Sequence, residues 1–158
     1  MPKTLPFARH PNSPRARRAK TMLLPMPRAT ADELALRVHL ALATMRTGAG
    51  SVRDAQTLTQ TMILTGFIAE AGYGAATYEQ LVVAEAAISA AFDRGRDTGE
   101  WRLDEGAASQ FAAIVTTYDE QLRRAPLWAV AEASERLDRF QAGEPYQRAD
   151  QQAGLSRH

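Results

Sequence analysis

The chain has 158 residues, which is enough for one domain, and its 45% apolar and 23% charged content is ordinary for a globular protein. It contains no cysteine, so disulfides, thiolate metal sites and cysteine nucleophiles are excluded. The net charge of +1 hides a split: residues 1–28 carry seven basic side chains and no acid, whereas residues 29–158 carry 12 basic and 18 acidic side chains, a net charge of −6. The composition therefore predicts a basic arm joined to an acidic body.

The first 28 residues hold six of the eight prolines and few apolar side chains. Proline at this density removes backbone donors and breaks helices, so we predict a disordered arm over residues 1–28. Its apolar cluster, residues 22–24, could dock on the body.

The cations of the arm are suited to phosphate contacts with release of counterions. The candidate nucleic-acid-binding residues are Arg9, Arg15, Arg17, Arg18, Lys20 and Arg28. The alternatives are another anionic partner and a solubilising tail without a partner.

The body, residues 29–143, is predicted to form five helices, and the 30 alanines of the chain favour helix formation. The first begins at a capping box made by Thr30 and Glu33 and stops at Gly48. The second runs from Ser51 to residue 71 and is apolar nearly all round over residues 62–68, which predicts that it lies at the centre of the bundle. Gly66, in its middle, suggests a close helix crossing.

The third helix opens at a second capping box, Thr77 with Gln80, and frays between Gly95 and Gly99. The fourth is capped by Asp104, and the fifth runs from Pro126 to Gly143. Residues 144–158 form a polar tail. The sequence thus predicts an all-α fold, a compact bundle of about five helices.

Candidate chemistry is sparse in this sequence. His39 has no second histidine or carboxylate at ligand spacing along its helix, so we interpret it as a surface or satisfied histidine. The carboxylate pairs at 32–33, 104–105 and 119–120 are interpreted as helix-start or surface acids, and no nucleophile elbow or phosphate loop is present. We predict a protein that is not an enzyme and has no metal or cofactor.

A helix-turn-helix reading of the second and third helices, around Gly72, is the sharper alternative to a plain helical hairpin. The would-be recognition helix, residues 75–86, contains no lysine or arginine and carries Glu79 and Glu85. Base-reading helices normally sit among cations that contact phosphates, so the hairpin is favoured.

No apolar stretch resembles a secretory signal or is long enough to cross a membrane, so we expect a cytoplasmic protein with no membrane partner. Residues 58–74 (LTQTMILTGFIAEAGYG), 118–126 (YDEQLRRAP) and 136–146 (RLDRFQAGEPY) resemble short bacterial helical proteins sometimes labelled Fis-type transcriptional regulators. The resemblance implies a regulatory role and DNA binding by a C-terminal helix-turn-helix. No site residue is transferred, because no second basic helix follows residues 127–141.

The sequence therefore predicts a non-enzymatic regulatory or accessory protein that associates with DNA through its basic arm. The alternative is a helical protein-interaction adaptor without nucleic-acid binding, whose partner, or a second copy in a homodimer, docks on a helix face.

Overall fold

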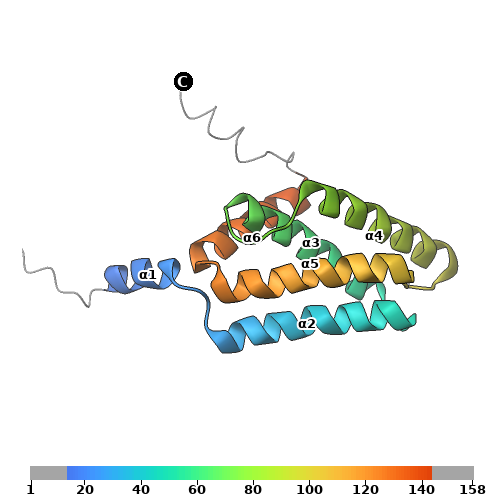
Figure 1. The fold of residues 1–158 in the computed structure, drawn as a ribbon, viewed down its shortest axis with the longest axis horizontal. Helices are drawn as coiled ribbons and strands as arrows, with labels where there is room; N and C mark the ends of the chain where they lie inside the picture. The colour runs from blue at the N-terminus through green and yellow to red at the C-terminus, as the bar shows by residue number, and fades with distance from the viewer. Residues whose placement is uncertain (1–13, 144–158) are drawn as a thin grey trace, which may run out of the picture.

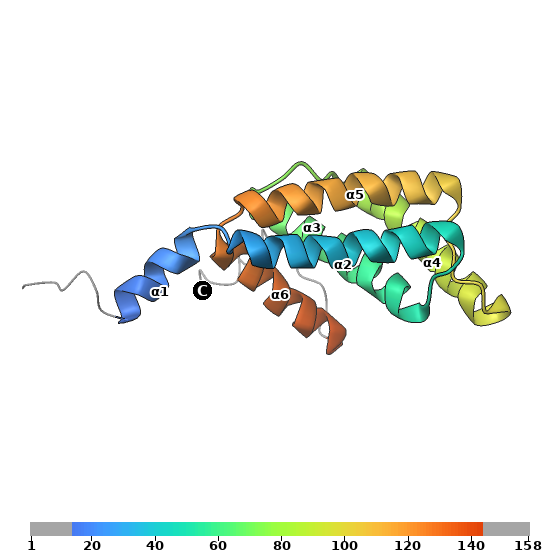
Figure 2. The ribbon, with the colours of Figure 1, turned by 90° about the horizontal axis from the view of Figure 1, so that it is seen from below.

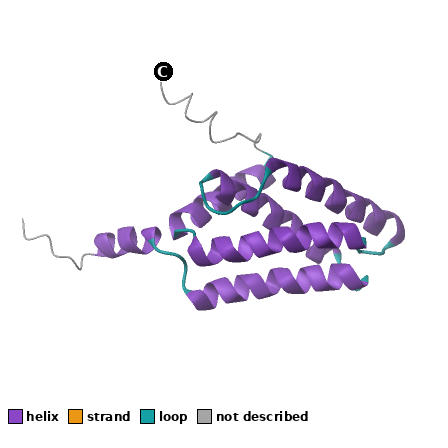
Figure 3. Cartoon of the chain, viewed as in Figure 1, coloured by secondary structure: helices purple, strands orange, loops and turns teal. Residues whose placement is uncertain are grey.

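The computed structural model describes residues 14–143, which form an all-helical bundle with no strand in that range (Figure 1, Figure 3). Its helices are α1 (Pro14–Leu23), α2 (Arg28–Thr47), α3 (Val52–Glu70), α4 (Tyr78–Thr98), α5 (Glu105–Arg124) and α6 (Leu127–Gln141). None of these helices is long and apolar enough to cross a membrane. The predicted all-α class is confirmed, but the predicted number of helices is wrong: the described part of the chain has six.

Helix α3 is the centre of the bundle, as its apolar sequence predicts. It packs against α2, α4, α5 and α6. The buried residues of α3 are Ala55, Leu58, Thr61, Met62, Thr65, Gly66, Phe67 and Ile68. At Gly66 an added Cβ would lie 2.9 Å from Cδ1 of Leu81, so the missing side chain permits the close crossing of α3 and α4.

Most helix boundaries follow local signals that the sequence displays. Ser51 and Thr77 each form a complete capping box, with Asp54 and Gln80 respectively, and Asp104 accepts a hydrogen bond from the backbone N–H of Ala107. These side chains satisfy N–H groups that would otherwise lack partners in the first helical turn.

The predicted start of the first body helix is wrong. Helix α2 begins at Arg28, directly after Pro27, and no side chain caps it. Thr30 is already the third residue of the helix, so it does not form the predicted capping box with Glu33. Pro27, with φ of −53°, directs the chain into the helix without needing a side-chain acceptor.

The predicted disorder of residues 1–28 is also wrong where the structure describes them, because residues 14–23 form α1. Proline is tolerated at the first position of a helix, and Pro14 occupies that position. The nine residues that follow contain neither proline nor glycine and are mostly good helix formers. The high proline content of the arm as a whole conceals this proline-free run. Residues 1–13 and the predicted polar tail, 144–158, lie outside the described residues.

The segment between α1 and α2 attaches to the body through Met26 rather than through the predicted apolar cluster. Met26 is 8% exposed, whereas Met22, Leu23 and Leu24 are all exposed. The carbonyl of Leu24 accepts a hydrogen bond of 2.8 Å from the backbone N–H of Leu127 at the start of α6. These contacts attach the segment after α1 to the body, and α1 extends beyond one end of the bundle (Figure 1, Figure 2).

Candidate functional site

Four of the six predicted nucleic-acid-binding residues lie together on α1. Arg15, Arg17, Arg18 and Lys20 are all exposed. The helix contains no acid and buries no side chain. At 100° per residue, positions 15, 17, 18 and 20 point to different sides of the helix, so the positive charge surrounds α1 rather than forming one stripe. Arg9 lies outside the described residues.

Arg28 stands apart from this group. It opens α2, and its Nε lies 3.9 Å from Oδ2 of Asp32 one turn later. The other oxygen of the same carboxylate lies 4.0 Å from Nη2 of Arg123 on α5. Arg28 therefore belongs to an exposed ion-pair group of the body, and its charge is less available to a phosphate than the charges on α1.

The structure also brings together a pair that sequence spacing does not reveal. Nε2 of His39, on α2, lies 2.6 Å from Oδ2 of Asp119, on α5, although 80 positions separate the two residues. Oδ1 of Asp119 is buried and has no hydrogen-bond partner in the described part of the chain. The interpretation of His39 as a satisfied histidine is correct, but its partner comes from one of the carboxylate pairs that we interpreted as surface acids.

Tyr118 adjoins this pair and is itself only 5% exposed. Burial of its phenol, helped by the neighbouring carboxylate of Asp119, raises the pKa of Tyr118, while Arg37 acts in the opposite direction. A histidine held by a carboxylate has the orientation that general bases need. However, no group of three histidine or carboxylate side chains capable of holding a metal exists within residues 14–143. The contact between His39 and Asp119 joins α2 to α5.

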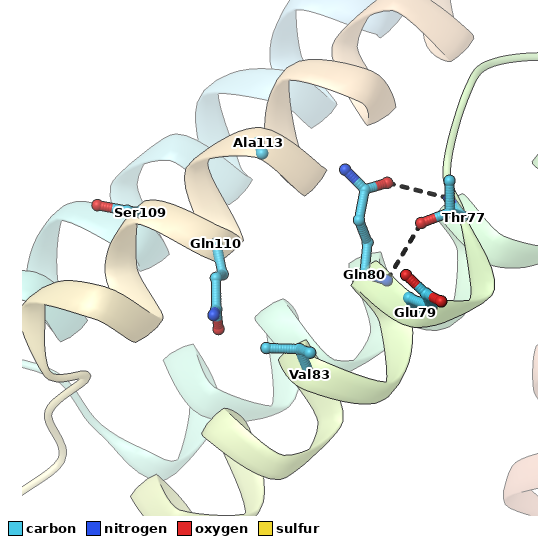
Figure 4. Close-up of a pocket in the computed structure, with 7 residues that line it drawn as sticks. All are labelled: Thr77, Glu79, Gln80, Val83, Ser109, Gln110 and Ala113. Carbon is cyan, nitrogen blue, oxygen red and sulfur yellow. Dashed lines mark hydrogen bonds between the residues drawn. The ribbon is translucent and has the colours of Figure 1, made fainter.

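An open groove of about 440 Å³ lies between the first turns of α4 and the first half of α5 (Figure 4). Its lining residues are Thr77, Glu79, Gln80, Val83, Ser109, Gln110 and Ala113. Oε1 of Gln80 is engaged in the capping box, where it accepts from the backbone N–H of Thr77 at 3.0 Å. Among the lining side chains only Glu79 ionises, so the groove offers hydrogen bonds and some apolar surface but no convergent acid and base.

The predicted recognition helix of the helix-turn-helix alternative is the beginning of α4. Its exposed side chains are apolar, acidic or neutral polar: Tyr78, Val82 and Val83 are exposed, as are Glu79, Glu85 and Gln80. The first cation on α4 is Arg94, near its other end. The N-terminal half of α4 therefore lacks the flanking cations that a base-reading helix uses.

Comparison of the chain with protein-family models, curated proteins and solved structures finds no match in any of the three. The resemblance to Fis-type regulators stays an expectation from the sequence. Function is therefore argued from the exposed surfaces described above.

Proposed function

We propose that this protein is a non-enzymatic regulatory or accessory protein that associates with DNA, and that α1 is the element that contacts the duplex. The observation that carries the proposal is the character of α1: four exposed cations, no acid and no buried side chain in ten residues. Contacts from arginine and lysine to phosphate dominate the affinity of proteins for DNA without specifying sequence.

The charge of the remaining chain supports the assignment to α1. Residues 29–158 have a net charge of −6 and would repel a duplex, whereas residues 1–28 have a charge of +7. The absence of buried side chains on α1 means that binding does not compete with packing of the bundle. The short segment anchored by Met26 fixes the base of α1 and leaves its cations in solvent.

The test is titration of a fluorescent duplex at several salt concentrations. Four phosphate contacts predict a slope of log affinity against log salt between about −3 and −4. The triple variant Arg15→Glu, Arg17→Glu, Arg18→Glu should abolish binding. A matched variant, Arg53→Glu, Arg124→Glu, Arg139→Glu, changes three exposed body cations and the net charge equally, and should retain most of the affinity.

Equal loss in the two triple variants would contradict the proposal, because net charge alone would then govern binding. Failure of the intact protein to bind duplex at low salt would also contradict it. Vesicles rich in phosphatidylserine serve as the comparison ligand. Binding to vesicles but not to duplex would assign α1 to an anionic membrane surface instead.

The alternative function, a protein-interaction adaptor, is favoured by one specific observation. Leu36 and Leu40 point outward from α2 and are 58% and 57% exposed. Neighbouring apolar side chains that the fold leaves uncovered mark a surface on which another protein can dock.

A further inference from the structure

Helix α2 has a buried apolar face and, on its opposite side, an exposed face that is apolar at its centre. One faces the core and consists of Ala31, Ala35, Val38, Ala41, Leu42 and Met45, all buried. The other faces away from the bundle and consists of residues spaced alternately by four and three: Ala29, Glu33, Leu36, Leu40, Ala43 and Thr47, all exposed. We call this second set the outer seam of α2. Helix α2 runs along one side of the bundle, as Figure 2 shows from below.

The spacing of the outer seam is that of a helix that packs lengthwise against another helix. Alternating intervals of four and three residues keep one row of side chains in line along a helix and define the a and d positions of a coiled coil. Leu36 and Leu40 form the centre of the seam, and the alanine and threonine side chains toward its ends are small enough for close approach. Glu33 is the charged member of the seam, and Arg37 of the same chain lies beside its carboxylate. The bundle already satisfies the core face, so the outer seam plays no part in the fold of a single chain.

We propose that the outer seam pairs with the same seam of a second copy of this chain, with the two α2 helices antiparallel. The two-fold axis then passes at the level of Val38. Leu36 meets the partner's Leu40 and Leu40 meets the partner's Leu36, so the two most apolar positions cluster at the axis. Two-fold dimers of this self-complementary kind are the commonest oligomers of soluble proteins.

The charges at the two ends of the seam complement one another in the antiparallel arrangement. On one flank Asp32 lies near the start of α2 and Arg46 near its end, and both are exposed. Reversing the second helix brings Asp32, whose carboxylate also lies near Arg28 and Arg123 of its own chain, opposite the partner's Arg46 at both ends of the interface. The opposed helix dipoles also favour this arrangement. On the other flank Arg37 meets its own copy, but Nη2 of each Arg37 lies 3.8 Å from Oε1 of Glu33 in the same chain, which offsets the repulsion.

The arrangement has a consequence for DNA binding, and this consequence rests on the proposed function. Arg28 lies ten residues before the axis, so the two α2 N-termini are separated by roughly 30 Å along the helices, at 1.5 Å per residue. The two α1 helices therefore begin at opposite ends of the dimer. Each α1 extends outward from its end of the bundle (Figure 1, Figure 2), so the two sets of α1 cations lie farther apart than the α2 N-termini and would contact separate segments of a duplex.

The first test is the oligomeric state of the whole protein without DNA, so its result is independent of the DNA proposal. Sedimentation velocity at tens of micromolar should show a dimer. Leu36→Glu should raise the dimer dissociation constant roughly tenfold or more, because it places a charge at the centre of the interface. Val82→Glu, at an exposed apolar position on α4, should leave the dimer intact. Since both side chains are exposed, both variants should keep the far-ultraviolet dichroism of the parent.

A monomeric parent protein, or a dimer that Leu36→Glu does not weaken, would overturn the proposal. The charges provide a second test: Arg46→Glu should weaken the dimer, and adding Asp32→Lys in the same chain should restore it. Failure of the second substitution to restore the dimer would contradict the antiparallel pairing.

Because the chain contains no cysteine, disulfides can form only between cysteines that are introduced by substitution. An equal mixture of Leu36→Cys and Leu40→Cys chains should form mixed disulfide dimers on oxidation, and neither chain alone should link efficiently. Efficient linking by Leu36→Cys alone would show a parallel pair and overturn the antiparallel arrangement. If the protein dimerises but does not bind DNA, only the proposed function is contradicted. If it binds DNA but does not dimerise, only this inference is contradicted.

Discussion

Helices α1 and α3 show two ways in which one chain can form a helix. Helix α3 buries eight of its 19 residues and packs against four other helices. Helix α1 buries none of its ten residues, and the helix that it packs against is α6. Packing of an apolar face stabilises α3, whereas α1 depends on the local preferences of its residues. Side chains without a role in packing are free to serve binding, so the comparison directs the search for function to α1 and to the outer seam of α2.

The largest difference between the two helices should appear when an apolar side chain is removed from each. Phe67 on α3 is 4% exposed, and the guanidinium carbon of Arg136 lies 3.9 Å from the centre of its ring. Phe67→Ala should lower the free energy of unfolding by about 3–5 kcal/mol. Leu23→Ala on α1, at a side chain 69% exposed, should change it by less than about 0.5 kcal/mol. Urea unfolding measures both, and similar losses would mean that α1 is part of the cooperative core.

A second substitution locates the boundary between the arm and the body. Met26 is buried although it lies within the segment predicted to be disordered. Met26→Ala should cost about 2–3 kcal/mol, because a buried methionine leaves a cavity. Deleting residues 1–21, which retains Met26 and the carbonyl of Leu24, should leave the melting temperature nearly unchanged. A large loss on that deletion would place the boundary earlier in the chain.

The sequence predicts the central parts of this fold well, because burial and capping leave local signatures. The continuous apolar run of α3 predicts its central position, and the capping residues Ser51, Thr77 and Asp104 predict three helix starts. The predictions fail where the composition of a long segment conceals a shorter element, and where a side chain contacts a residue far away in the sequence. The prolines of residues 1–28 flank a proline-free run that forms α1, and the high proline content of the whole arm conceals this run.

Contacts between residues far apart in sequence could not be predicted. Nothing near His39 indicates that Asp119 will meet it from another helix. Gly95 was predicted to lie in a frayed helix end, but α4 continues to Thr98 and Gly95 is buried beneath the ring of Trp101. The outer seam of α2 is visible in the sequence as a spacing, yet its significance emerges only when the core face of the same helix is known to be satisfied elsewhere.

Two capping motifs with the same sequence signature provide a smaller and sharper test of how helices begin. Thr77 caps α4, and Gln80 N–H donates to its hydroxyl at 3.2 Å. Thr30 has the same spacing to Glu33 but lies inside α2. Thr77→Ala should cost about 1 kcal/mol, whereas Thr30→Ala should be neutral or slightly stabilising, because alanine is the better helix former. Equal losses would show that Thr30 does act as a cap and that α2 begins later than the structure indicates.

The smallest expected effect concerns the pH dependence of stability and comes from a buried ionisable side chain. Such a side chain occurs in the packed body, whereas α1 buries none. The phenol of Tyr118 has a pKa raised above its ordinary value of 10.0, chiefly by burial. Below about pH 10 the folded and unfolded states both keep this proton, so the full stability is present. As the pH rises further, the unfolded state loses its proton first, and stability falls until the raised pKa of the folded state is passed.

Tyr118→Phe removes this titration. The free energies of unfolding of parent and variant should therefore run parallel from pH 6 to 8 and converge or cross above about pH 10, with the parent losing more. Curves that stay parallel up to pH 11 would mean that the phenol ionises as easily in the folded protein as in the unfolded chain, and that the α2–α5 contact beside Asp119 opens to water without unfolding the bundle.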